Sequence, residues 1–188
     1  MKPLPRSFYL REDVVLIARD LLGKVIVSTI GGKTTSGIIT ETEAYNGTID
    51  RASHAFGGRR TARNAQMYAR GGTAYVYLCY GIHHLFNVVT HQVDIPHAVL
   101  VRAILPLYGV DVMHDRRGGI LRTTGPGMVS QALGILTQHN GMDLLSGDVR
   151  IEDHGIAVHE DRVTCGPRIG VDYAGPDAAL PYRFVHTP

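Results

Sequence analysis

Apolar side chains recur at helical spacing in two stretches of the chain. Over residues 12–22 the positions that share one face are Val14, Ile17, Ala18, Leu21 and Leu22. Acidic residues stand in the first turn and Gly23 follows the last, so the pattern predicts a core-packing helix over 12–22. A short helix is expected after Pro106. Another is expected after Gly125-Pro126, where positions 129, 132, 133 and 136 are apolar and proline can occupy the first turn.

Other stretches carry the β-branched and aromatic residues that are typical of strands. Residues 24–30 and 37–45 are expected to pair around Gly31-Gly32, and residues 74–80 and 85–90 around a turn at 81–84. The apolar pattern of residues 98–104 predicts a further buried strand. We therefore expect a single α+β domain over residues 1–188, a mainly antiparallel curved β-sheet with flanking helices and a protruding β-hairpin.

The composition fits this expectation. Hydrophobic residues make up 44% of the 188 residues and charged residues 19%, which is typical of one globular domain. The N-terminus lacks the apolar run of a signal peptide, and no stretch reaches the roughly 18 apolar residues of a membrane span. We expect no membrane partner and a cytoplasmic, nucleoid-associated protein. Cys79 and Cys165 have no partnering spacing and are read as ordinary thiols.

The net charge of +2 conceals an uneven distribution of charge along the chain. Residues 51–142 carry nine arginines against Asp94, Asp111 and Asp115, a balance of +6, whereas residues 143–188 carry four bases against eight acids, a balance of −4. Five of these arginines fall in one acid-free stretch: Arg51, Arg59, Arg60, Arg63 and Arg70. This stretch suits a surface that contacts phosphates; a solvated basic loop is the alternative.

Two carboxylates stand beside an aromatic residue in the strand expected over 37–45. Alternation places Ile39, Glu41, Glu43 and Tyr45 on one face, with the two glutamates about 6.6 Å apart at strand rise. This separation is similar to the carboxyl spacing of inverting glycosidases, about 6.5–9.5 Å. The alternative is an edge strand that exposes both glutamates to solvent.

Several common catalytic motifs are absent from the sequence. It contains no His-Glu-x-x-His and no Cys-x-x-Cys, so a zinc protease or zinc nucleobase deaminase is not indicated, and it contains no phosphate-binding Gly-x-x-x-x-Gly-Lys. Its only lysines are Lys2, Lys24 and Lys33, outside the suspected site region. The sequence therefore offers no evident Schiff-base nucleophile.

Taken together, several segments resemble the alkyladenine (3-methyladenine, methylpurine) DNA glycosylase family. The matching residues are Glu41-Thr42-Glu43-Ala44-Tyr45, Ser53-His54, Arg59, Thr61-Ala62-Arg63-Asn64, Tyr75-Val76-Tyr77, Tyr80-Gly81, Asn87 and Val99-Leu100-Val101-Arg102-Ala103. The resemblance extends from about Phe8 to Arg168-Ile169-Gly170-Val171. Two features depart from it: Ala62 stands where the family usually has proline, and the loop between Asn87 and Arg102 is slightly longer than in vertebrate members.

The resemblance implies a reaction that needs neither a metal nor an organic cofactor, and a role for each site residue. Glu43 would be the general base that deprotonates the attacking water. Tyr45 on one side, and Tyr77 with His54 on the other, would stack a flipped purine; each could instead be a core residue. Alkylation at a ring nitrogen makes the purine cationic and a good leaving group, and aromatic faces attract such a base.

The remaining roles concern selectivity and DNA contacts. By resemblance, Tyr80 at the hairpin tip would be a wedge in the DNA minor groove, and Asn87 would disfavour the exocyclic amino group of guanine. Arg102 is either a pocket residue or a structural ion-pair residue. Arg59, Arg60 and Arg63 would contact phosphates.

We therefore expect a monofunctional DNA glycosylase of base excision repair that acts as a monomer on damaged double-stranded DNA. One alternative is a non-catalytic lesion-sensing module, which an intact Glu43 disfavours. Another is a nucleoside or glycoside hydrolase that uses Glu41 and Glu43.

Overall fold

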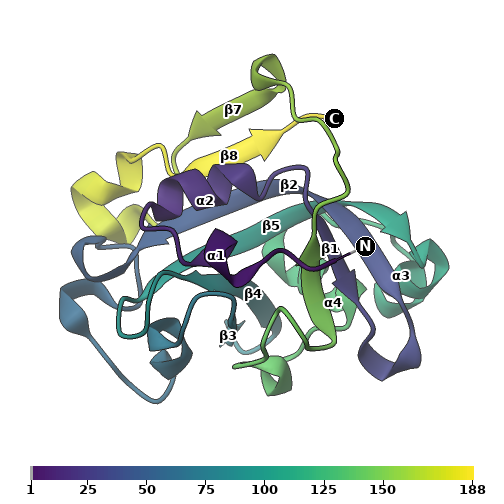
Figure 1. Ribbon diagram of the computed structural model, residues 1–188, viewed down its shortest axis with the longest axis horizontal. Coiled ribbons are helices and arrows are strands. Elements are labelled where there is room, and N and C mark those ends of the chain that lie inside the picture. Colours follow the sequence, from purple (N-terminus) through teal and green to yellow (C-terminus); the bar gives the residue numbers. More distant parts are fainter. Residues whose placement is uncertain (1) are drawn as a thin grey trace.

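An antiparallel β-sheet forms the centre of the computed structural model, which describes residues 2–188 (Figure 1). Its strands are β1 (Val25–Ser28), β2 (Thr35–Asn46), β3 (Ala74–Cys79), β4 (His83–Thr90), β5 (His97–Tyr108), β6 (Val149–Glu152), β7 (Val163–Gly166) and β8 (Arg183–His186). The main order is β3-β4-β5-β2-β1-β6, and β8 pairs with both β2 and β7. The expected α+β class with a mainly antiparallel sheet is confirmed.

Four α-helices accompany the sheet among the described residues: α1 (Arg6–Tyr9), α2 (Val14–Asp20), α3 (Val110–Arg116) and α4 (Pro126–Leu133). α2 is shorter than predicted, because Asp13 is its N-cap and accepts hydrogen bonds from the Val15 and Leu16 amides. α4 ends at Leu133, because the next residue, Gly134, has a φ of 75° that stops the helix. Leu136, which periodicity placed on its apolar face, therefore lies outside the helix and is half-exposed.

The main core joins the helices to one face of the sheet. Ile17 of α2 and Leu133 of α4 belong to the same buried cluster as Phe86 of β4 and Val101 of β5. Figure 1 shows α2 lying across β2 and β5. On this face the Thr42 hydroxyl donates to the Ala18 carbonyl at 2.7 Å, so alternation turns the neighbouring β2 residue, Glu43, to the opposite face.

The pairing of β2 with β5 is interrupted beside the two glutamates. Ile39 pairs with Ile104, and Thr42 pairs with Val101, but the register shifts on both sides of Glu41. Because of this bulge, Ile39 belongs to the main core rather than to the face that carries Glu41, Glu43 and Tyr45. The predicted grouping of Ile39 with the glutamates was wrong.

The expected hairpin forms between β3 and β4, with a turn that is shorter and earlier than predicted. Tyr80, Gly81 and Ile82 connect the strands, and His83 and His84 already belong to β4. Tyr80 is 90% exposed and has a φ of 50°, in the left-handed region that disfavours an aromatic residue. The tip of the hairpin therefore presents an unpacked aromatic ring to solvent.

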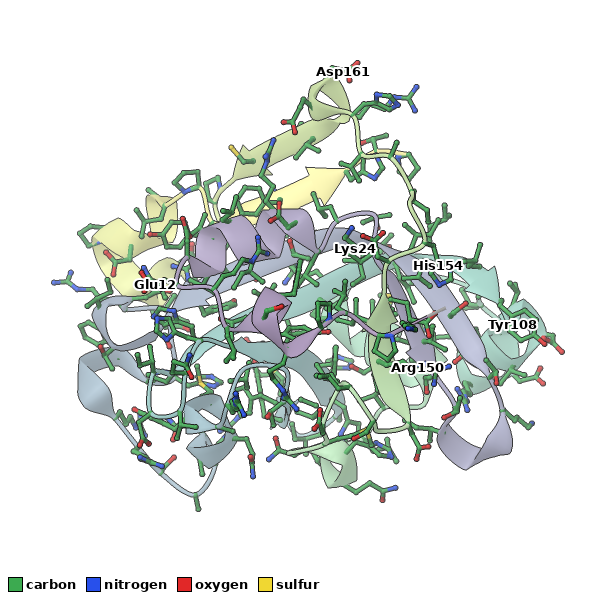
Figure 2. All side chains as sticks on the ribbon, viewed as in Figure 1. Glu12, Lys24, Tyr108, Arg150, His154 and Asp161 are labelled. Carbon is green, nitrogen blue, oxygen red and sulfur yellow. The ribbon has the colours of Figure 1, made fainter. Side chains whose placement is uncertain are left out.

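The structure also contains elements that the hydrophobic pattern did not predict. β5 continues to Tyr108 because a register shift lets Pro106 sit opposite Gly37. Tyr108 is 62% exposed and points outward in Figure 2. The short strands β6, β7 and β8 have no periodic signal of their own, and the pairing of β8 with β2 brings the C-terminal segment next to Glu43.

None of the helices formed by residues 2–188 has the length and apolar character needed to cross a membrane. Cys79 is half-buried at the end of β3, and Cys165 is exposed on β7; both thiols are free.

Candidate active site

A cavity of about 640 Å³ opens on the face of β3, β4 and β5 that points away from the main core. The start of α4 and residues 169–173 complete its wall. All five predicted substrate-binding residues line it: Tyr45, His54, Tyr77, Asn87 and Arg102. Tyr80 and Arg63 also line it, whereas Arg59 and Arg60 do not. The fold thus gathers residues that lie far apart in the sequence into one concave site.

Glu43 lies beneath this cavity and is fully buried. Its Oε1 accepts a hydrogen bond from the Ile169 amide at 2.7 Å, and its Oε2 accepts one from the Tyr45 hydroxyl at 2.9 Å. Burial raises the pKa of Glu43, while the Arg102 charge and these two hydrogen bonds lower it. Both oxygens are thus oriented by donors, and burial increases the tendency of the carboxylate to accept a proton.

Arg102 joins the two glutamates of β2. Its Nε lies 3.1 Å from Glu41 Oε1 and 3.4 Å from Glu43 Oε1. Arg183 Nη1 of β8 also lies 3.1 Å from Glu41 Oε1. Glu41 is therefore held between two arginines and is not a free carboxylate at a solvent-facing edge. The two glutamates converge on one guanidinium, which leaves no room between them for the sugar and water of an inverting glycosidase.

An aromatic cluster forms the wall at β3. The His54 ring lies 4.7 Å from the Tyr77 ring, and the Tyr75 ring lies 5.3 Å from the same ring, centroid to centroid. The Tyr75 hydroxyl lies 2.9 Å from His54 Nδ1. Burial, followed by the charges of Arg63 and Arg59, lowers the pKa of His54, so its imidazole is neutral near neutral pH. Burial also raises the pKa of Tyr75 to about 12, so this wall carries no charge near neutral pH.

Asn87 lies in the middle of β4 and is buried. Its Nδ2 donates to the Tyr75 carbonyl at 3.1 Å and to the Leu85 carbonyl at 3.3 Å. These bonds hold the amide against the sheet and occupy its donor. Asn87 therefore does not cap a turn, and its side chain has little freedom to move away from the cavity.

The rim of the cavity combines exposed aromatic rings with arginines. Tyr80 and Tyr173 both line the mouth. Arg63 Nη2 donates to the Leu78 carbonyl at 3.0 Å. Arg60 forms an exposed ion pair with Asp94 at 2.7 Å, so part of its charge is already compensated.

Several residues of the site lacked a predicted role. Tyr75 could have been found, because it precedes Tyr77 by two residues on one strand and so shares its face. Tyr173 and the Ile169 amide gave no local signal, because they lie more than 120 residues along the chain from their hydrogen-bond partners. Among residues 2–188 we find no group of three or more His, Cys, Asp or Glu that could hold a metal ion.

Comparison with known proteins places the chain in a family. Residues 7–188 match the family model described as methylpurine-DNA glycosylase. The chain belongs to the methylpurine-DNA glycosylase family. It is 50% identical over 187 residues to a protein of Chlamydia felis and 40% identical over 196 residues to one of Bacillus mycoides, each named “Putative 3-methyladenine DNA glycosylase”. Both alignments cover 97% of this chain and 95% of the relative.

Membership of this family makes the chain a DNA glycosylase, a hydrolase of N-glycosyl bonds with a role in DNA repair. DNA is therefore its substrate. The resemblance read from the sequence is confirmed over nearly the whole chain, whereas the roles of the individual site residues remain predictions.

Proposed function

We propose that the glycosylase flips an alkylated or deaminated purine out of double-stranded DNA into the cavity and hydrolyses its N-glycosidic bond with a water activated by Glu43. The buried Glu43, oriented by Tyr45, Ile169 and Arg102 directly beneath an aromatic cavity, carries this proposal. The names of the relatives point to 3-methyladenine as one substrate.

The attacking water would bind beneath the flipped nucleotide, between Arg102 and Glu43. Arg102 Nη1 lies 3.5 Å from Glu43 Oε2, the longest and therefore the weakest contact of this carboxylate. A water that bridges the two groups would replace only this weak hydrogen bond. As the N-glycosidic bond breaks, its electron pair leaves with the base and the sugar becomes oxocarbenium-like. The water oxygen then bonds to the anomeric carbon, and its proton passes to Glu43.

The cavity wall suits the proposed base. An alkylated purine is cationic, and the uncharged rings of Tyr45, Tyr77 and His54 offer π-faces without electrostatic repulsion. Asn87 would exclude guanine by steric contact with its exocyclic amino group. Because two carbonyls hold the Asn87 amide, the side chain cannot turn aside to admit that group.

The outer residues would hold the duplex. The exposed ring of Tyr80 would fill the gap left by the flipped nucleotide. Arg59, Arg60 and Arg63 would contact phosphates next to it. None of the residues that line the cavity is a lysine, which supports a monofunctional reaction that leaves an intact abasic strand.

The test compares the natural enzyme with Glu43→Gln on duplexes that contain 3-methyladenine, hypoxanthine or ethenoadenine. Glutamine keeps the shape of the side chain and removes the proton acceptor. We expect lesion binding within a few fold of wild type and single-turnover base release lower by about 10²–10⁴-fold. The strand should break only after heat or alkali.

Two outcomes would contradict the proposal. Base release by Glu43→Gln at near the wild-type rate would exclude Glu43 as the general base. Tight lesion binding by the wild-type protein, without base release from any of the three duplexes, would instead favour the lesion-sensing module.

A further inference from the structure

A buried ion pair lies behind the cavity wall, on the far side of Tyr45. The Arg168 side chain is fully buried and Asp50 is 1% exposed. Arg168 Nη2 donates to Asp50 Oδ1 at 2.8 Å, and Nη1 donates to the other carboxylate oxygen. Nη1 also donates to the Ala44 carbonyl at 2.9 Å. A bidentate pair this deeply buried is costly to desolvate, so its position next to the site calls for a reason.

The pair touches the parts of the chain that hold Glu43. The Arg168 guanidinium carbon lies 4.9 Å from the centroid of the Tyr45 ring, and the Tyr45 hydroxyl donates to Glu43 Oε2. The Ala44 carbonyl that Arg168 binds lies between Glu43 and Tyr45 in β2. The residue after Arg168 is Ile169, whose amide donates to Glu43 Oε1.

Asp50 extends this connection to the segment after β2. Besides Arg168, its carboxylate accepts from the Asn46 amide at 2.9 Å and from the Ala52 amide at 3.0 Å. It therefore fixes the turn between Tyr45 and the cavity residues Ala52 and His54. The Arg168 guanidinium thus packs against the Tyr45 ring on the side away from the cavity. The Arg168–Asp50 pair also fixes the segment that follows Tyr45 and the segment that contains Ile169.

We propose that the Arg168–Asp50 pair is a positioning unit that sets the direction of the Tyr45 hydroxyl and the Ile169 amide, and through them the orientation of the Glu43 carboxylate. The inference rests on the proposed role of Glu43 as general base. Neither Arg168 nor Asp50 is among the residues that line the cavity, so both act through other groups. The bidentate bonds to Asp50 require the planar fork of a guanidinium rather than a point charge, and the guanidinium carbon lies over the Tyr45 ring.

Arg168→Lys tests the proposal, because it keeps the charge beside Asp50 and removes the planar fork. Single-turnover base release from a 3-methyladenine duplex is measured across pH and expressed per folded molecule. We expect the maximal rate to fall on the order of tenfold to a hundredfold, as for other small displacements in an active site, with lesion affinity within threefold of wild type. The loss of donors should raise the pKa of Glu43, so the acid limb of the rate profile should move to higher pH.

The matched control is Arg116→Lys. Arg116 is partly buried and donates to the carbonyls of Ile30 and Ala132, away from the cavity. Its replacement should lower stability and leave the rate per folded molecule and the acid limb unchanged. A merely structural role of Arg168 would make the two variants behave alike.

The outcomes separate this inference from the proposed function. If Glu43→Gln abolishes base release while Arg168→Lys matches wild type in rate and acid limb, the positioning unit is refuted and the general base stands. If Glu43→Gln releases base normally, the proposed function itself fails. Should Arg168→Lys not fold, Asp50→Asn measured in the same way decides: a shifted acid limb supports the proposal, and an unshifted one overturns it.

Discussion

Replacing Tyr80 with glycine should make the glycosylase more stable and less able to recognise lesions. Tyr80 is 90% exposed, so its ring contributes almost no packing that could be lost. Its φ of 50° is unfavourable for a residue with a Cβ by about 1–2 kcal/mol, and glycine removes that strain. Glycine also gives the unfolded chain more freedom, which costs about 0.4–1 kcal/mol. The net gain is on the order of 0.5–1 kcal/mol, or about 1–4 °C in melting temperature.

The effect on DNA binding should have the opposite sign. If the ring fills the gap left by a flipped nucleotide, its loss removes part of the few kcal/mol that unstacking requires. A loss of about 2 kcal/mol would weaken binding to a lesion duplex roughly 30-fold. Binding to undamaged DNA, and the dependence of binding on salt, should stay the same, because no phosphate contact is removed.

Thermal melting and salt titrations on matched lesion and undamaged duplexes measure both effects. Tyr108→Gly is the control, since Tyr108 is also exposed but is the last residue of β5 and does not line the cavity. It should lower stability, because glycine weakens a strand, and leave both affinities unchanged. An equal loss of affinity for both duplexes with Tyr80→Gly would refute the wedge, and a lower melting temperature would refute the strain.

Two further predictions concern charge. Asp94→Asn should release Arg60 from its surface ion pair and strengthen binding to lesion and undamaged DNA alike. The slope of log affinity against log salt concentration should steepen by up to about 0.9. An unchanged slope would exclude a phosphate contact by Arg60. Tyr45→Phe removes one hydrogen-bond donor to the Glu43 carboxylate, so the pKa of Glu43 should rise and the acid limb of base release should move to higher pH. An unmoved limb in single-turnover measurements would show that this hydrogen bond does not tune the base.

The local sequence pattern was sufficient to predict elements in which the same face is buried along the whole element. The helical spacing of Val14, Ile17 and Ala18 predicted α2 because those residues alone form its buried face. The aromatic strand residues before Gly81 predicted a hairpin with Tyr80 at its tip. Alternation along β2 correctly placed Glu43 and Tyr45 on the same face.

Pairing between strands that are distant in the sequence determined which face some β2 side chains occupy and which partners they have. Ile39 left the face of Glu43 because a bulge against β5 reversed the alternation, and no property of β2 alone specifies that bulge. Glu41 was a possible second catalytic carboxylate in the sequence, but in the structure it pairs with Arg102 and Arg183. These ion pairs form because β5 and β8 lie on either side of β2.

The hydrogen bonds that hold Glu43, the proposed general base, were the least predictable feature. Arg168 and Ile169 follow β7, and they reach Tyr45 and Glu43 because β7 pairs with β8 and β8 pairs with β2. A four-residue strand and a backbone amide have no periodicity to recognise, and their contacts join residues more than 120 positions apart. The sequence by itself therefore determined which groups can perform the chemistry. The long-range antiparallel pairing determined how the carboxylate is buried, which donors hold it and which charges surround it.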